Sequence, residues 1–233
     1  MKLLLIGHGR MGTLVEALAP EFGFDLAGVI DEFSADDALE AANCPRADVA
    51  IDFTTAAAVE SNLPKLATLG INVVIGTTGW NDREPQLREI AERAGLGVVA
   101  APNFSVGAIL FTEIAARAGE LFAAREEFGS WIHEGHHAAK RDAPSGTALG
   151  LKRRLERAGY VRSVDMSSTR AGYMPGVHTV GFDGPSETVT LTHTVRDRGT
   201  FARGALLAAR WVHGRRGWFT MHDCLGLGGG GAG

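Results

Sequence analysis

The chain has 233 residues, of which 45% are hydrophobic and 21% are charged, and its formal net charge is -4. These values are ordinary for a globular protein, and the mild acidity argues against nucleic acid as the main partner. No apolar run approaches the roughly 18 residues that a membrane span needs, so we expect no membrane segment. The two cysteines, Cys44 and Cys224, show no ligand-like spacing. We therefore expect a reducing, cytoplasmic setting without disulfides.

The first thirty residues follow the order that is typical of dinucleotide-binding proteins. An apolar strand over residues 3–6 precedes the glycine-rich loop 7–12, a helical stretch, and a second strand over residues 24–30 that ends in Asp31. This order predicts that a pyrophosphate binds at the helix N-terminus and that Asp31 binds the adenosine ribose hydroxyls. A tight turn that binds no ligand is the alternative.

Asp31 also bears on the choice of cofactor. A carboxylate at this position repels the 2′-phosphate of NADP, and residues 32–36 contain no Arg or Lys that would bind it. Arg10, inside the glycine loop, is the one nearby cation. We expect NADH to be preferred, with NADPH tolerated through Arg10.

Strands and helices continue to alternate up to residue 103, which predicts a doubly wound parallel sheet whose ligands bind beyond the carboxyl ends of the strands. Polar residues at those ends, Thr54, Thr77, Thr78 and Asn103, favour the wall of a nicotinamide and ribose pocket, with routine helix capping as the alternative. The expected strands cover residues 49–54, 71–75 and 98–100, and the expected helices cover residues 56–69 and 85–94.

After residue 104 the pattern changes to α+β. We predict helices over residues 106–124, 147–158 and 200–213, strands over 129–132 and 218–221, and a hairpin of strands 178–182 and 188–192. The fold class is thus α/β, with a doubly wound Rossmann-type parallel sheet and a second α+β domain for substrate binding and oligomerisation. The expected dinucleotide-binding domain covers residues 1–103 and is completed by 198–225, the second domain covers 104–197, and 226–233 form a flexible Gly-rich tail.

A basic loop over residues 133–147 leads into the expected helix 147–158. Three histidines, a lysine and an arginine fall within residues 133–141 of an acidic chain. Cationic groups beside a helix N-terminus favour an anion. His136, His137 and Lys140 offer proton donors of different pKa, which proton transfer near neutral pH requires. A solvated basic loop is the alternative.

The same loop contains His133-Glu134-Gly135-His136-His137, which matches the zinc peptidase motif HExxH. That motif requires a helix, whereas here it follows an apolar strand and is interrupted by Gly135, so we expect no metal. A nicotinamide sensor without catalysis is a further alternative, and the His136/Lys140 pair argues against it.

Taken together, the motifs of this chain resemble those of the dihydrodipicolinate reductase family. The motifs are Gly9-Arg10-Met11-Gly12, Asp52-Phe53-Thr54, Gly76-Thr77-Thr78-Gly79, Asn103-Phe104-Ser105-Val106-Gly107, the segment from Glu134 to Thr147, and Arg198 with Phe201, Ala202, Gly204 and Ala205.

The resemblance implies an NAD(P)H-dependent reduction of 4-hydroxy-tetrahydrodipicolinate, a small cyclic dicarboxylate, in lysine and diaminopimelate biosynthesis by a homotetramer. A same-fold reductase of another small imine or keto acid is the alternative. The family's catalytic residues fall on His136 and Lys140, and its substrate contacts fall on His137, Gly146 and Thr147. Its cofactor contacts fall on Gly7, His8, Gly9, Arg10, Met11, Gly12, Asp31, Gly76, Thr77, Thr78, Ala101, Pro102, Asn103 and Phe104.

The chain departs from the family pattern at two places. Its glycine loop is one residue shorter than in many members, and Pro102 replaces a commoner small residue and removes one N–H. His178, His193, His213 and His222 carry no family motif, and we interpret them as structural or surface residues.

Overall fold

The computed structural model describes residues 1–35 and 37–228. The end of the expected Gly-rich tail, residues 229–233, lies outside the described residues. The chain divides into two compact units, one formed by residues 1–106 with the chain from Arg198 onward, and one formed by residues 107–197.

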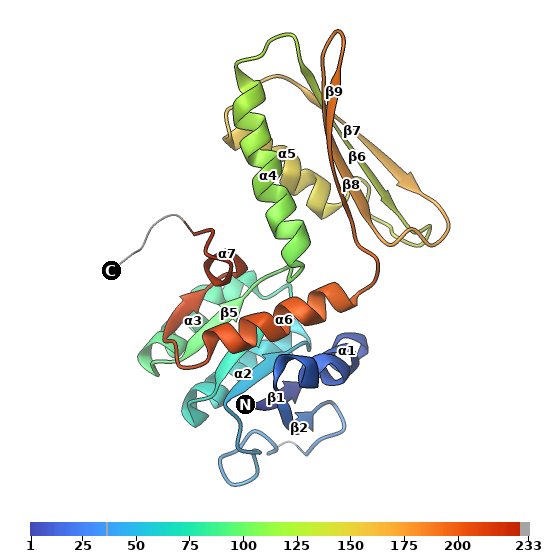
Figure 1. Ribbon diagram of the computed structural model, residues 1–233. Coiled ribbons are helices and arrows are strands. Elements are labelled where there is room, and N and C mark those ends of the chain that lie inside the picture. Colours follow the sequence, from blue (N-terminus) through green and yellow to red (C-terminus); the bar gives the residue numbers. More distant parts are fainter. Residues whose placement is uncertain (36, 229–233) are drawn as a thin grey trace. The chain divides into compact units, whose positions relative to one another are not determined.

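The first unit contains a six-stranded parallel sheet in the order β10-β5-β4-β3-β1-β2 (Figure 1). The strand order reverses between β1 and β3, which is where doubly wound sheets bind their ligands. The α/β class predicted from the alternation is confirmed. The strands are β1 (Lys2–Ile6), β2 (Asp25–Ile30), β3 (Val49–Asp52), β4 (Asn72–Ile75), β5 (Gly97–Ala100) and β10 (Gly217–Phe219).

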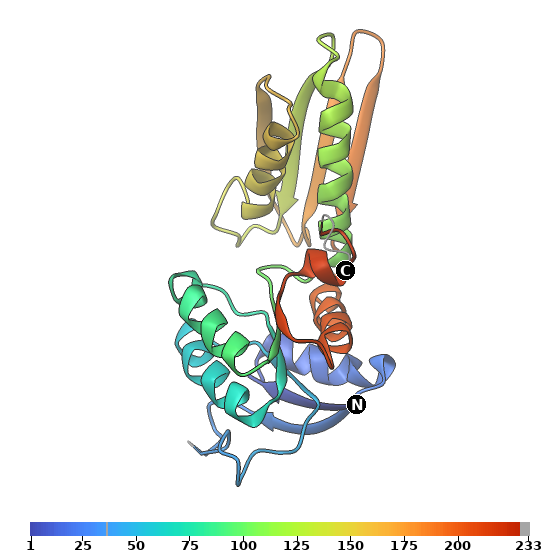
Figure 2. The ribbon, with the colours of Figure 1, turned by 90° about the vertical axis from the view of Figure 1, so that its left-hand side faces the viewer.

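Helices cover both faces of this sheet, as Figure 2 shows. The four central strands β1, β3, β4 and β5 are almost wholly buried, so they are continuous apolar runs instead of alternating ones. One face packs against α1 (Arg10–Leu18) and α6 (Gly199–Val212), and the other against α2 (Ala56–Leu69) and α3 (Glu84–Arg93). Two 3-10 turns, Ala19–Phe22 and Asn81–Arg83, and the short α7 (Met221–Cys224) complete the unit.

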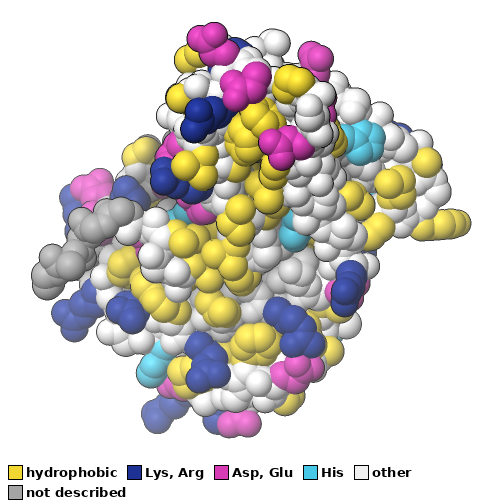
Figure 3. Space-filling model, turned by 45° about the horizontal axis from the view of Figure 1, so that its top comes forward, with side chains coloured by type: hydrophobic (Ala, Val, Ile, Leu, Met, Phe, Trp, Pro, Cys, Tyr) yellow, Lys and Arg dark blue, Asp and Glu magenta, His cyan; other side chains and the backbone are white. Residues whose placement is uncertain are grey.

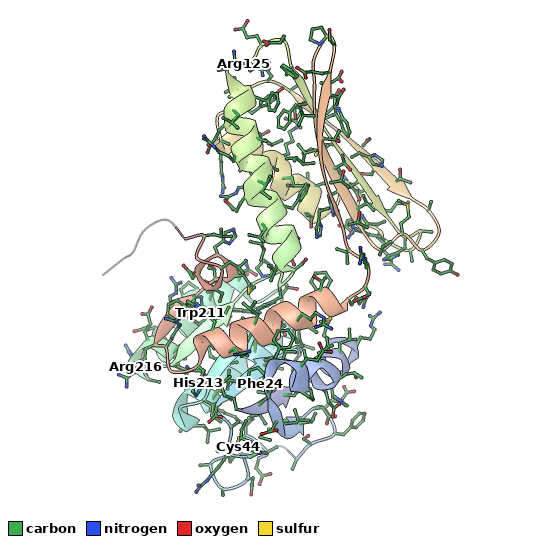
Figure 4. All side chains as sticks on the ribbon, viewed as in Figure 1. Phe24, Cys44, Arg125, Trp211, His213 and Arg216 are labelled. Carbon is green, nitrogen blue, oxygen red and sulfur yellow. The ribbon has the colours of Figure 1, made fainter. Side chains whose placement is uncertain are left out.

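The C-terminal segment belongs to this unit because β10 pairs with β5 at the edge of the sheet. Trp218 on β10 packs edge-on against Trp80, with ring centroids 6.0 Å apart. Trp211, near the end of α6, packs against Phe219 at 4.9 Å (Figure 4). Both tryptophans thus pack inside the first unit.

The second unit is a four-stranded mixed sheet in the order β7-β6-β8-β9, with two helices on one face (Figures 1 and 2). β7 runs parallel to β6, and the β6/β8 and β8/β9 pairs are antiparallel. Phe111, Leu151 and Leu155 from the helices meet Ile132 and Phe182 from the sheet in one core. The elements are α4 (Val106–Ala123), β6 (Gly129–His136), α5 (Gly146–Arg157), β7 (Val164–Arg170), β8 (Val177–Asp183) and β9 (Thr188–Thr194).

Two features of the second unit differ from the sequence analysis. The strand expected over 129–132 continues through His136, so His133 to His136 are strand residues and the loop begins at His137. The edge strand β7 was not predicted, because only Val164 and Met166 among its seven residues are apolar and the strand carries little periodic signal.

On the face seen in Figure 3, acidic and basic side chains are interspersed. No helix among the described residues combines the length and the hydropathy that crossing a membrane would require.

Candidate active site

The glycine loop of the first unit is tightly folded against its neighbours. Gly7 has φ +87°, and a Cβ there would lie 2.6 Å from the Phe53 carbonyl oxygen. A Cβ at Gly12 would lie 2.1 Å from the Gly7 carbonyl oxygen, so α1 can approach the loop only with glycine at this position. α1 begins at Arg10 after Gly9, with no side-chain cap on its free N–H groups. These groups can therefore bind a phosphate.

A pocket of about 550 Å³ lies between the glycine loop and the end of β2. Gly7, His8, Gly9, Asp31 and Glu32 line it, and no Lys or Arg occurs among its described lining residues. The Asp31 carboxylate is oriented by hydrogen bonds from the Phe33 N–H at 3.0 Å and the Ser34 hydroxyl at 3.2 Å. This acidic rim fits ribose hydroxyls and disfavours a further phosphate.

A second pocket, of about 360 Å³, contains Arg10, Met11, Gly76, Thr77 and Thr78, together with Gly9 and Arg198. Arg10 lines this second pocket and is absent from the lining of the Asp31 pocket. The sequence analysis assigned Arg10 the role of tolerating a 2′-phosphate. In the second pocket Arg10 and Arg198 are two cations beside the N-terminus of α1, and a contact of Arg10 with a 2′-phosphate stays a prediction.

The buried carboxylate of Asp52 positions the threonines of the second pocket through hydrogen bonds. Its carboxylate is 1% exposed and accepts hydrogen bonds from the Thr54 hydroxyl at 2.6 Å and the Asn62 amide at 2.9 Å. The Thr77 hydroxyl in turn accepts from the Thr54 N–H at 2.8 Å. Burial raises the pKa of Asp52, and these hydrogen bonds oppose the rise. The sequence analysis quoted Asp52 as part of a motif and gave it no role.

The remaining predicted cofactor residues fall into two groups. Ala101 and Pro102 line a small third pocket together with Thr77 and Thr78. Gly12, Asn103 and Phe104 line none of the described pockets of the first unit. Asn103 accepts a hydrogen bond from the Ser105 N–H at 2.8 Å, and Phe104 is buried edge-on against Phe53.

In the second unit, β6 ends in a buried polar cluster. Glu134 and His136 are two residues apart in the strand, so both face the helices, and the Glu134 carboxylate is hydrogen-bonded to Nδ1 of His136. Arg170, at the end of β7, donates to both carboxylate oxygens, at 2.9 and 2.6 Å. Burial alone would raise the pKa of Glu134, but hydrogen bonds from Arg170, Ser168 and His136 lower it to about 2.

His178 on β8 completes this cluster. Its ring packs edge-on against that of His136, with centroids 5.1 Å apart, and its Nε2 lies 3.0 Å from the Ser145 hydroxyl. Burial first, and then the nearby His136, lower the pKa of His178 to about 4. The sequence analysis interpreted His178 as structural, and in the structure its ring lies against the predicted catalytic histidine.

The basic loop returns to this cluster at the start of α5. The Ser145 N–H donates to the Glu134 carboxylate at 3.2 Å, and the Ser145 hydroxyl caps α5 by accepting from the Ala148 N–H. Gly146 and Thr147 therefore form the first turn of α5. Within the loop, the Lys140 ammonium lies 2.8 Å from the Asp142 carboxylate. The hydrogen bond from Ser145 back to Glu134 thus closes the chain between them into a short loop. This closed segment contains His136 and Lys140 and leads into the start of α5.

The zinc peptidase alternative fails on geometry. His133 and Glu134 are strand neighbours on opposite faces of the sheet, and His133 is hydrogen-bonded to Ser167 at 2.8 Å. Among the described residues, the carboxylate of Glu134 and the rings of His136 and His178 lie close enough to hold a metal ion. However, Arg170 already occupies both oxygens of that carboxylate.

Besides His178, three residues of this cluster were not predicted as site residues. Glu134 and Ser145 stand inside the quoted loop motif, and only their contacts reveal what they do. Arg170 lies 36 positions from Glu134 on a strand that the sequence analysis did not predict. No spacing in the sequence identifies it.

Comparison with known proteins assigns the family. Residues 1–104 match the family model "Dihydrodipicolinate reductase, N-terminus", and residues 107–225 match "Dihydrodipicolinate reductase, C-terminus". A solved structure described as a dipicolinate-bound dihydrodipicolinate reductase from a Paenisporosarcina species shares the fold. Its TM-score is 0.80 at 22% identity, over 96% of this chain and 98% of that one.

Curated relatives named 4-hydroxy-tetrahydrodipicolinate reductase match over almost their whole length. The protein from Thiobacillus denitrificans is 37% identical over 94% of this chain and 96% of its own. The protein from Methanoregula boonei is 35% identical over 97% and 98%, and the one from Christiangramia forsetii is 32% identical over 97% and 98%. The resemblance stated from the motifs is confirmed, and the chain belongs to the dihydrodipicolinate reductase family of nicotinamide-dependent oxidoreductases.

Proposed function

We propose that the protein reduces 4-hydroxy-tetrahydrodipicolinate to tetrahydrodipicolinate, with loss of water, in lysine and diaminopimelate biosynthesis. The observation that carries this proposal is the closed segment from His136 to Thr147. It gathers an imidazole, an ammonium group and the first N–H groups of α5, which are the groups that a cyclic dicarboxylate needs for binding and protonation.

Each of these groups has a distinct proposed role. The Gly146 and Thr147 N–H groups and the Thr147 hydroxyl bind one substrate carboxylate, and His137 contributes charge toward the other. Bound NADH supplies the hydride. Loss of the 4-hydroxyl and a neighbouring C–H proton as water gives a conjugated imine. Hydride addition to that imine leaves an electron-rich enamine, which must then take up a proton on carbon. Lys140 is the proposed donor, and His136 stabilises charge or shares that role.

We infer that NADH is the preferred cofactor. The pocket beside Asp31 supports this inference, because its described lining contains Asp31 and Glu32 and no Lys or Arg that would bind a 2′-phosphate. Gly7, Gly9 and Asp31 would hold the adenosine half, and Thr77 and Thr78 would face the nicotinamide half.

The test is oxidation of NADH and NADPH in the presence of substrate generated in situ by the synthase that makes it. We expect turnover by the wild type and a loss of about 100-fold or more for Lys140→Ala, because general acid catalysis contributes this much. Lys152→Ala, on α5 of the same unit, is the matched control and should keep full activity. If the wild type binds both cofactors and turns over no substrate, the function is either a sensor or a reductase of another imine or keto acid.

We further infer a cytoplasmic homotetramer, on the strength of the family resemblance and the open face of the second unit's sheet. The side chains of β9 on that face are largely exposed. Light scattering should give about four times the chain mass of 24.6 kDa. A monomer mass would contradict this inference.

A further inference from the structure

We propose that Glu134 is a positioning residue: it fixes the tautomer and the direction of the His136 ring, and Arg170 holds Glu134 in place for this task. The catalytic meaning of this inference rests on the proposed function, in which His136 acts on the substrate.

Glu134 and His136 are in direct contact through a hydrogen bond. The Glu134 side chain is 1% exposed and that of His136 is 14% exposed, and Nδ1 of His136 is hydrogen-bonded to Oε2 of Glu134. One ring nitrogen is therefore committed to a buried carboxylate. Among the described residues, Nε2 of His136 has no hydrogen-bond partner, so it is the nitrogen that a ligand can reach.

Arg170 and Ser145 hold the Glu134 carboxylate in place. Arg170 donates from both terminal nitrogens to Glu134, and it is itself fixed by the Asp142 carbonyl at 2.6 Å and the Thr169 carbonyl at 2.8 Å. The Ser145 N–H adds a donor to Oε1 at 3.2 Å. Donors thus face both oxygens of Glu134, so the carboxylate can only accept hydrogen bonds. Its bidentate pair with Arg170 fixes its orientation.

The consequence for His136 follows from this arrangement. Because the ionised carboxylate only accepts, Nδ1 must carry a proton, and in the neutral ring Nε2 then keeps its lone pair. Proton exchange with a substrate thus takes place at Nε2, while Nδ1–H stays bonded to Glu134. When Nε2 takes a proton, the imidazolium that forms is stabilised by the adjacent carboxylate, as carboxylate–histidine pairs do elsewhere.

The amide of Glu134→Gln cannot reproduce this pattern. With its oxygen at the Oε1 position it accepts from Arg170 Nη2 and the Ser145 N–H, and its NH₂ group then faces Nδ1 of His136 and one donor, Arg170 Nη1. The opposite orientation would set the NH₂ group against two donors, Arg170 and the Ser145 N–H. We therefore expect the neutral ring in this variant to switch to the Nε2–H tautomer, which presents a donor to the substrate.

Nitrogen-15 NMR of the histidine-labelled full chain without substrate tests this directly. His136→Asn identifies the His136 signals. We expect a protonated Nδ1 and an unprotonated Nε2 in the neutral wild-type ring, and the reverse in Glu134→Gln. Glu113→Gln is the matched control: it removes another carboxylate paired with an arginine of the same unit, Arg154, and should leave the His136 signals unchanged.

Kinetics provide the second readout. Glu134→Gln should lower kcat by about 100-fold, with little change in the dissociation constant of NADH, since the cofactor pockets lie in the other unit. A wild-type ring with a proton on Nε2 and none on Nδ1 overturns the proposal, and so does an unchanged tautomer and kcat in a folded Glu134→Gln. If that variant does not fold, the wild-type tautomer alone decides. A Nδ1–H tautomer in a wild type that turns over no substrate would contradict the proposed function and leave the positioning role intact.

Discussion

Asp31 is one of two carboxylates in the pocket that we propose holds the adenosine ribose, so its replacement should change the choice between the two nicotinamide cofactors. Asp31→Ser removes the carboxylate that repels a 2′-phosphate. We expect the ratio of kcat/KM for NADPH to that for NADH to rise by about tenfold, which corresponds to roughly 1.4 kcal/mol. Asp25→Ser, at the other end of β2, is the control and should leave the ratio unchanged. An unchanged ratio in Asp31→Ser would assign cofactor choice to other residues.

His178 should make the stability of the protein depend on pH. Its pKa is about 4 in the folded chain against an ordinary 6.5, so only the unfolded chain takes up this proton between those values. The free energy of unfolding should therefore fall as the pH drops from 6.5 to 4, by an amount on the order of 3 kcal/mol. Glu134, whose folded pKa of about 2 lies below its ordinary 4.5, adds a further loss between those two values.

Urea unfolding at several pH values measures this effect. His178→Gln should flatten the dependence between pH 6.5 and pH 4, whereas His213→Gln, at an exposed site at the end of α6 (Figure 4), should not. An equal pH dependence in wild type and His178→Gln would refute the account of this residue.

At this scale the sequence predicts the residues that stand in motifs and misses those that support them. His136, Lys140 and Asp31 are candidates from sequence because glycine, histidine and lysine spacings carry chemical meaning, and their roles stay predictions. Arg170 and His178 act through contacts between strands that are far apart in sequence, and burial together with the neighbouring His136 lowers the pKa of His178. Neither property is encoded in local spacing.

Gly9 and Gly12, at the turn between β1 and α1, have different roles that substitutions can distinguish. In Gly12→Ala the new methyl would meet the Gly7 carbonyl at 2.1 Å, whereas at Gly9 nothing lies within 4 Å of the added atom. Gly12→Ala should lower the free energy of unfolding by about 1–3 kcal/mol, because the clash outweighs the gain of roughly 1 kcal/mol in helix propensity.

Gly9→Ala should fold with normal stability, within about 0.5 kcal/mol, and yet bind NADH more weakly, because Gly9 lines both of the pockets that we propose hold the cofactor. Thermal unfolding and fluorescence titration with NADH measure the two effects. Equal stability of the two variants would contradict the packing argument for Gly12.

Elements with strong periodicity are predictable and those without it are not. The bounds of α2 agree with the prediction at both ends, since Thr55 caps its start and Gly70 ends it. β6 was expected to end at Ile132, because His133 to His136 are polar and resemble a loop in sequence. In the structure they are paired on both sides, with β7 and with β8, and burial of Glu134 is compensated by Arg170.

At the scale of the whole molecule, the predicted groups fall into separate units. The glycine loop and Asp31 belong to the first unit, and His136, Lys140 and the start of α5 belong to the second. The chain returns to the first unit through α6 and β10, which the sequence analysis expected from the need to cover the sheet edge. The proposed reduction uses both sets, the cofactor-binding groups of the first unit and the proton donors of the second.

Transfer of deuterium from NADH labelled at the transferable C4 position tests that chemistry most directly. The wild type would be incubated with the labelled cofactor and with substrate generated in situ, and the product would be analysed by mass spectrometry. The account predicts one deuterium on carbon in each molecule of tetrahydrodipicolinate, formed in step with NADH oxidation. Product without deuterium, or labelled NADH that binds and is never oxidised, would contradict the claim that this chain is a hydride-transferring reductase of this substrate.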